Sequence, residues 1–131
     1  MTQYAKDQWE RAQDSLEVAR RSGIDHPDST ASLSYYAAFH AANALFALRD
    51  QYFAKHTALR AAVHRDLIHG ENWAPALGAD FDMLAQLRMT GNYGGTSHVS
   101  PEQAAAALDA AQRILDAVRA SCPQVESPGP A

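Results

Sequence analysis

The sequence predicts an all-α fold, an up-and-down antiparallel helical bundle of about five helices. Apolar residues recur at spacings of three and four in several segments, which is the period of an amphipathic helix. No segment alternates apolar and polar residues as a half-buried strand does. Glycine and proline separate the periodic segments by mostly short connections, and short connections favour antiparallel neighbours.

The first expected helix runs from Gln3 to about Arg21, with a single apolar face, and Gly23 is a natural end for it. The second, from about 29 to 52, is apolar on nearly every side along 33–48. It is therefore expected to be the central helix of the bundle. Its alanines allow close backbone approach, and large residues such as Phe39 supply the volume that fills the core.

The third helix is expected over about 57–69 and the fourth over about 76–89. The segment that follows, 91–95, contains two adjacent glycines and predicts an irregular loop. The fifth helix has a clear start, because Ser100 is placed as N-cap and Gln103 can reach back to it. It should end near residue 120.

A chain of 131 residues has the size of one domain. We expect the bundle to occupy residues 1–121. Residues 122–131 are rich in proline and have little to bury, which predicts a disordered C-terminal tail.

The net charge of −4 argues against a protein that coats nucleic acid by bulk electrostatics, but it leaves room for a local basic face. His56, Arg60 and His64 are spaced by four on the expected third helix. This stripe has two interpretations, contact with phosphate or a solvated helix face, and we favour the solvated face because basic faces are common.

A reducing, cytoplasmic setting is expected, because Cys122 has no partner for an internal disulfide and the first residues lack a secretory signal. No apolar stretch approaches the roughly 20 residues of a membrane span, so no membrane partner is expected. The six histidines lack the spacings typical of metal ligands. We therefore expect no metal and no other cofactor.

Two segments in this order resemble the HEPN family of helical-bundle proteins. They are Ser34-Tyr35-Tyr36-Ala37-Ala38-Phe39-His40-Ala41-Ala42 and, later, Arg88-Met89-Thr90-Gly91-Asn92-Tyr93-Gly94. The resemblance extends from about residue 5 to 119 and is strongest to small stand-alone HEPN proteins, which are often paired with minimal nucleotidyltransferases. It implies a homodimer.

Catalytic HEPN proteins are metal-independent endoribonucleases that use an arginine followed, after four to six residues, by a histidine. The resemblance places that arginine at Arg88, whereas the window for the histidine holds Tyr93 and two glycines. A phenol with a pKa near 10 is a poor general base. His98 is a second candidate to replace the imidazole. The catalytic candidates are therefore Arg88, Tyr93 and His98, and the candidates for binding nucleic acid or nucleotide are Arg88, Asn92, Arg60 and His64.

Two purely structural interpretations and one chance match accompany these assignments. Arg88 could form an ion pair or a carbonyl contact at the end of the fourth helix, and Tyr93 could pack as a partly buried ring on the second. Arg49 and His56 also match the arginine-to-histidine spacing by count. We interpret that match as chance, because both residues are expected to lie away from the Arg88 region.

Taken with the resemblance, the sequence favours an interaction module. It would bind RNA or a nucleotide, or a nucleotidyltransferase partner in a toxin–antitoxin-type system, without strong catalysis. The alternative is a metal-independent HEPN endoribonuclease with a variant active site that uses Arg88 and either Tyr93 or His98. Whether the protein is an enzyme stays open at this point.

Overall fold

The computed structural model describes residues 2–71 and 73–126. Its five α-helices are α1 (Gln3–Ser22), α2 (Pro27–Ala47), α3 (His56–Ala62), α4 (Pro75–Tyr93) and α5 (Pro101–Ser121). α3 continues directly into the π-helical segment η2 (Val63–His69), and two short 3-10 turns are η1 (Gly23–Asp25) and η3 (Pro123–Glu126). The described ranges contain no strand, and the predicted all-α bundle is confirmed.

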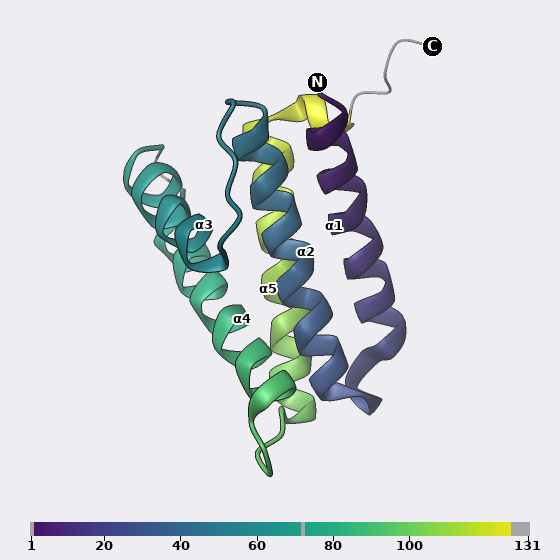
Figure 1. Ribbon diagram of the computed structural model, residues 1–131. Helices are drawn as coiled ribbons and strands as arrows, with labels where there is room; N and C mark the ends of the chain where they lie inside the picture. The colour runs from purple at the N-terminus through teal and green to yellow at the C-terminus, as the bar shows by residue number, and fades with distance from the viewer. Residues whose placement is uncertain (1, 72, 127–131) are drawn as a thin grey trace.

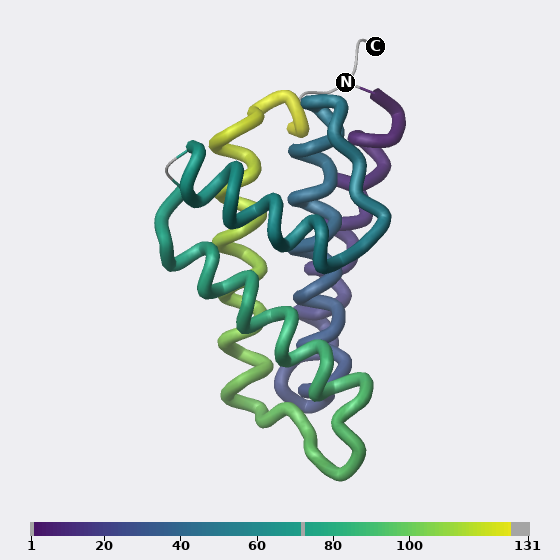
Figure 2. The backbone as a smooth tube through the Cα atoms, turned by 60° about the vertical axis from the view of Figure 1, so that its left-hand side comes forward, coloured from purple at the N-terminus to yellow at the C-terminus, as the bar shows by residue number. Residues whose placement is uncertain are grey.

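α2 lies at the centre of the bundle and contacts α1, α4 and α5 (Figure 1). The four long helices alternate in direction along the chain (Figure 1). The connection over 48–55 does not lead straight into an antiparallel neighbour. It runs back beside α2, so that α3 begins near the middle of α2 before η2 continues to the turn that precedes α4 (Figure 2).

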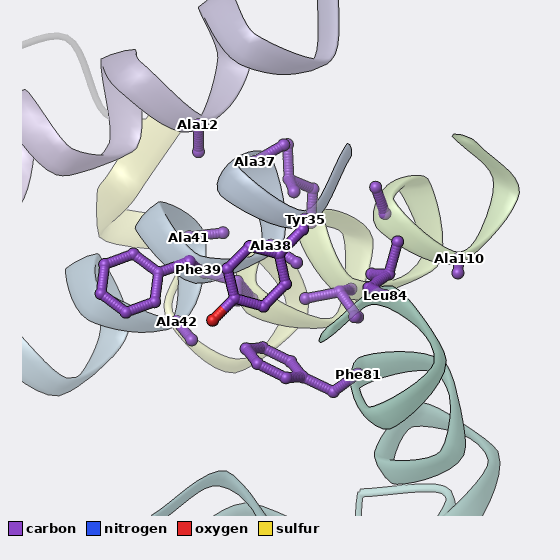
Figure 3. Packing of buried hydrophobic residues seen from close by; sticks show 14 of the residues in the cluster. Ala12, Tyr35, Ala37, Ala38, Phe39, Ala41, Ala42, Phe81, Leu84 and Ala110 are labelled. Atoms are coloured by element: carbon purple, nitrogen blue, oxygen red, sulfur yellow. The ribbon is translucent and has the colours of Figure 1, made fainter. Parts of the chain in front are cut away.

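The core is built around α2, as its composition predicts. The fully buried alanines of α2 let neighbouring helices approach closely, and its large buried side chains fill the core. Figure 3 shows the ring of Tyr35 beside Phe39, Phe81 and Leu84. Tyr35 is 2% exposed, and its ring meets that of Phe81 edge-to-face at 6.2 Å between centroids.

Two predicted helix ends were wrong. α2 ends at Ala47, because the chain turns at Leu48–Asp50, where Asp50 has a positive φ of 57°. α4 continues to Tyr93, so the expected irregular loop is helical over 91–93. Gly91 serves close packing here, since a Cβ at this position would lie 3.0 Å from the backbone oxygen of Asp28.

The predicted capping box of α5 is confirmed: Ser100 Oγ accepts from the Gln103 amide, and Gln103 Oε1 accepts from the Ser100 amide. The predicted disordered tail needs correction over 122–126. Cys122 and Val125 are buried, because η3 folds this stretch against the end of the bundle. The remainder of that predicted tail, 127–131, lies outside the described residues.

Within the described ranges, none of the helices combines the length and the apolar character that crossing a membrane would require.

Candidate functional site

Arg88 projects from α4 toward two tyrosines of α2. Its guanidinium carbon lies 5.2 Å from the centroid of the Tyr35 ring and 5.3 Å from that of Tyr36. Nη2 donates to the Tyr36 phenol oxygen at 3.2 Å. These cation–π contacts and the hydrogen bond hold the guanidinium in one place. Burial lowers the pKa of Arg88, but the hydrogen bond and the nearby phenols outweigh it and raise the pKa above its ordinary value, so the group stays charged.

The charge of Arg88 has no carboxylate partner among the described residues. By contrast, Arg49 pairs with Glu71, Arg60 with Asp82 and Arg113 with Asp80. The Nε atom of Arg88 is buried and has no hydrogen-bond acceptor within the described part of the chain. The alternative in which Arg88 serves an ion pair or a carbonyl at the end of α4 is therefore wrong. Its positive charge is not neutralised by a carboxylate of the described residues.

His56, the first residue of α3, lies in the same pocket. Its ring stacks on Phe39 with 4.2 Å between centroids, and its Nδ1 is 2.7 Å from the Tyr35 phenol oxygen. Burial, and then the charge of Arg88, lower the pKa of His56 below its ordinary value of 6.5. The expectation that His56 lies away from Arg88 was thus wrong. The connection over 48–55 brings it back beside α2.

The Arg88 pocket is a cavity of about 180 Å³ between α2, α3 and α4. It is lined by Tyr35, His56, Thr57, Arg60, Ala85, Arg88 and Met89. A neighbouring cavity of about 360 Å³ is lined by Thr57, Arg60, Ala61, His64 and Asp82. Since Thr57 and Arg60 line both, the two cavities are contiguous along the groove between α3 and α4.

Asp82 of α4 lies at the end of this groove farther from Arg88. Its Oδ1 accepts from Arg60 Nε at 2.8 Å and lies 2.9 Å from His64 Nε2. Burial raises the pKa of Asp82, but the hydrogen bonds from His64 and Arg60 lower it more, so the carboxylate stays ionised. Arg60 and His64 of the basic stripe therefore face α4 and remain partly solvated, since their side chains are 44% and 34% exposed.

The π-helical geometry of η2 accompanies this close approach to α4. A Cβ on Gly78 of α4 would lie 2.9 Å from the Cε1 atom of His64, so the absence of a side chain at this position leaves room for the imidazole. Local π-helical turns are often found at functional sites.

The other predicted site residues lie nearer the amino-terminal end of α2. Asn92 Oδ1 accepts from Ser32 at 2.5 Å. His98 Nδ1 lies 2.7 Å from one oxygen of Asp28, whose other oxygen accepts from the Val99 amide at 2.8 Å. Neither Asn92 nor His98 lines the Arg88 cavity.

Tyr93 ends α4 and is 67% exposed, so the alternative of a partly buried ring on α2 is wrong. The structure therefore brings Arg88 and Arg60 into one cavity and His64 into the next one. It leaves Asn92, Tyr93 and His98 outside both.

The site residues predicted from the sequence leave out Tyr35 and His56, which line the pocket, and Tyr36, which accepts a hydrogen bond from Arg88. The available signal for the two tyrosines was that a buried tyrosine hydroxyl needs a polar partner. The available signal for His56 was its place in the same stripe as Arg60.

The fold and the pocket define a class of protein: a small all-α bundle in which an arginine, without a carboxylate partner among the described residues, is held between tyrosines beside a groove. The sequence model described as the HEPN domain matches residues 5–121, nearly the whole chain, and the chain belongs to the HEPN domain family. No curated protein matches this sequence significantly. Family membership supports a general nucleotide- or RNA-related module, and HEPN domains commonly dimerise.

Proposed function

We propose that this chain is a homodimeric HEPN interaction module that binds RNA or a nucleotide through the Arg88 pocket, without strong catalysis. The observation that carries the proposal is the state of Arg88: charged, held by two tyrosines, and without a carboxylate partner among the described residues. A guanidinium in this state attracts phosphate, for which its planar set of donors is suited. Arg60 also lines this cavity, although its guanidinium pairs with Asp82.

Neither of the two residues that the sequence offers in place of the catalytic histidine is a suitably placed acid or base, which argues for binding without efficient cleavage. Tyr93 occupies the position that resembles the catalytic histidine of HEPN nucleases, and it does not line the Arg88 cavity. His98 is engaged by Asp28 and does not line the Arg88 cavity. General acid–base assistance contributes typically about 10²- to 10⁴-fold, so its loss leaves weak cleavage at most.

A second copy of the chain would cover the outer face of α4. Met89 and Tyr93 lie four residues apart on this helix and are 52% and 67% exposed, so they form an apolar pair beside the pocket. Pairing with a nucleotidyltransferase-type protein in a toxin–antitoxin-type system is part of the proposal, and its support is the resemblance to small stand-alone HEPN proteins.

Binding is tested with a labelled single-stranded RNA and with adenosine 5′-monophosphate. We expect Arg88→Gln to weaken the affinity about tenfold or more, because a hydrogen-bonded charge on the phosphate is lost. The matched control is Arg20→Gln, which makes the same change of charge on α1, where Arg20 contacts Gln112 away from the pocket. Equal affinities of wild type and Arg88→Gln would overturn the assignment of the pocket.

The competing function is a metal-independent endoribonuclease that uses Arg88 with Tyr93 or His98. It gains one observation in its favour, since His56 places an imidazole in the Arg88 cavity. The test is RNA digestion with chelator present, comparing wild type with Arg88→Ala, Tyr93→Phe, His98→Ala and His56→Ala.

Little or no cleavage by the wild type supports the binding module. Robust cleavage that is lost with His98→Ala or His56→Ala would identify that imidazole as a catalytic group and overturn the proposal. Cleavage lost only with Tyr93→Phe would implicate the phenol. Cleavage that persists in all four variants would come from a contaminant and would leave the binding module standing.

A further inference from the structure

We propose that His56 is a phosphate-binding residue, that its neutral ring presents an Nε2–H donor to the same phosphate group that Arg88 binds, and that Tyr35 is the positioning residue that selects this tautomer. The inference deepens the proposed function and rests on it.

The tautomer follows from the hydrogen-bonding needs of Tyr35. Its side chain is almost fully buried, and a buried hydroxyl hydrogen requires an acceptor. Among the described residues, the acceptor within reach of the phenol is Nδ1 of His56, at 2.7 Å. If Nδ1 carried the proton, the phenol hydrogen would lose this acceptor. Nδ1 therefore accepts, and a neutral ring then holds its proton on Nε2.

Three contacts keep the ring neutral and oriented. Burial and the charge of Arg88 disfavour protonation and lower the pKa of His56, and a proton on Nδ1 would also compete with the Tyr35 hydrogen bond. The stack on Phe39 fixes the plane of the imidazole. Nε2 has no hydrogen-bond partner among residues 2–71 and 73–126, and His56 lines the cavity.

The polar groups of this cavity are therefore mostly donors. They are the Nε2–H of His56, the guanidiniums of Arg88 and Arg60, and the hydroxyl of Thr57. No carboxylate lines this cavity; Asp82 lines the neighbouring one, where it pairs with Arg60 and leaves the charge of Arg88 uncompensated among the described residues. A cluster of donors with net positive charge selects an anion.

The size and the walls of the cavity favour phosphate. At about 180 Å³ it is smaller than the roughly 300–1,000 Å³ of typical small-molecule pockets, so it suits one phosphate group. Ala85 and Met89 form an apolar wall that a sugar or base can contact, and the neighbouring cavity on Arg60 extends the site. A nucleoside monophosphate and an RNA backbone both supply such a phosphate.

The same tautomer explains binding without cleavage. A general base needs a free lone pair toward the substrate, whereas Nε2 already carries a proton and Nδ1 is occupied by Tyr35. His56 in this state donates to a phosphate oxygen and does not remove a proton from a 2′-hydroxyl.

The decisive variants are His56→Asn and His56→Gln. The asparagine amide is too short to reach the position of Nε2, while the glutamine amide N–H can approach it. We expect His56→Asn to weaken binding of phosphate-bearing probes about tenfold or more, because it loses one donor to a charged group. We expect His56→Gln to retain most of the affinity, because it keeps that donor. His69→Asn, on an exposed histidine at the end of η2, is the matched control and should bind as wild type does.

Three probes distinguish the source of the phosphate: inorganic phosphate, adenosine 5′-monophosphate, and a short RNA without terminal phosphates. If His56→Asn loses affinity for the nucleotide, the site binds a phosphate monoester. If it loses affinity for the RNA, the site binds a phosphodiester. Equal affinities of wild type and His56→Asn for all probes, with binding still lost in Arg88→Gln, would overturn this inference and leave the proposed function intact. Failure of the wild type to bind any probe would overturn both.

An independent readout concerns the ring itself. Long-range nitrogen–proton NMR correlations of the histidine rings, assigned with His56→Asn, should show the Nε2–H form of His56 in the wild type. They should show a mixture of tautomers in Tyr35→Phe, which should also bind phosphate more weakly. A ring protonated on Nδ1 in the wild type would overturn the proposal even if both variants bind poorly through loss of structure.

Discussion

The Nδ1 atom of His56 lies 2.7 Å from the phenol oxygen of Tyr35, and this contact joins the start of α3 to the middle of α2. The two residues are separated by 21 positions, and the connection that returns along α2 brings them together (Figure 2). The imidazole also stacks on Phe39. The shape of the Arg88 pocket therefore depends on how this connection is folded, as well as on the helix that bears the arginine.

Phe39→Ala should lower the free energy of unfolding by about 3 to 5 kcal/mol, because removal of a ring that is 7% exposed leaves a large cavity. Urea unfolding followed by circular dichroism measures the loss. Val18→Ala, at a side chain that is 48% exposed on α1, should change stability by no more than about 0.5 kcal/mol. A loss below about 1 kcal/mol for Phe39→Ala would contradict the placement of this ring in the core.

The free energy of unfolding should fall as the pH drops from about 8 to 5. Burial lowers the pKa of both His40 and His56 in the folded state below the ordinary value of 6.5. As the pH falls, the unfolded chain therefore binds protons before the folded chain does. The stability that these groups contribute is complete above about pH 6.5 and is lost as the pH falls toward the folded-state pKa values.

Urea unfolding at a series of pH values tests this dependence. His40→Gln should flatten the curve, because it removes one of the two partly buried imidazoles, whereas His26→Gln, at an exposed histidine, should leave it unchanged. A wild-type stability that is constant over this range would contradict the prediction.

Ser100→Ala should cost about 1 kcal/mol of unfolding free energy, within the roughly 0.5 to 2 kcal/mol seen for lost N-caps. The Ser100 hydroxyl accepts from the Gln103 amide at 3.0 Å. In the variant, the Gln103 amide would lose this acceptor. Ser97→Ala, in the exposed loop before α5, is the control and should be nearly neutral. The two variants are compared by their urea midpoints, and equal midpoints would argue against the capping box.

Sedimentation at micromolar concentration should show a dimer that Tyr93→Asp or Met89→Asp converts to a monomer. A charge placed among apolar side chains at an interface is costly to bury. Ile24→Asp introduces the same charge at another exposed apolar residue, on η1, and should leave the dimer intact. A monomeric wild type would contradict the proposed interface on α4. If all three variants remained dimers, the interface would lie on another surface.

The helical elements were predictable because their signals are local. The apolar composition of α2 and the Ser100 capping box each depend on residues a few positions apart, and both predictions are confirmed. The ends of α2 and α4 were less predictable. Gly91 has the sequence signature of a helix end, yet it lies within α4, since contact with the backbone of Asp28 is what requires a glycine there.

The sequence by itself determined the all-α class, the central place of α2 and the identity of Arg88 as a residue to examine. Only the tertiary structure decided what surrounds that arginine. Periodicity tells which face of a helix is buried, but not which distant helix covers it. His56 comes beside Arg88 because the chain doubles back after α2, and His98 lies beside Asp28 because the loop before α5 folds onto the start of α2. Such contacts between segments far apart in the chain arise from packing of the whole bundle, which no spacing within one segment encodes.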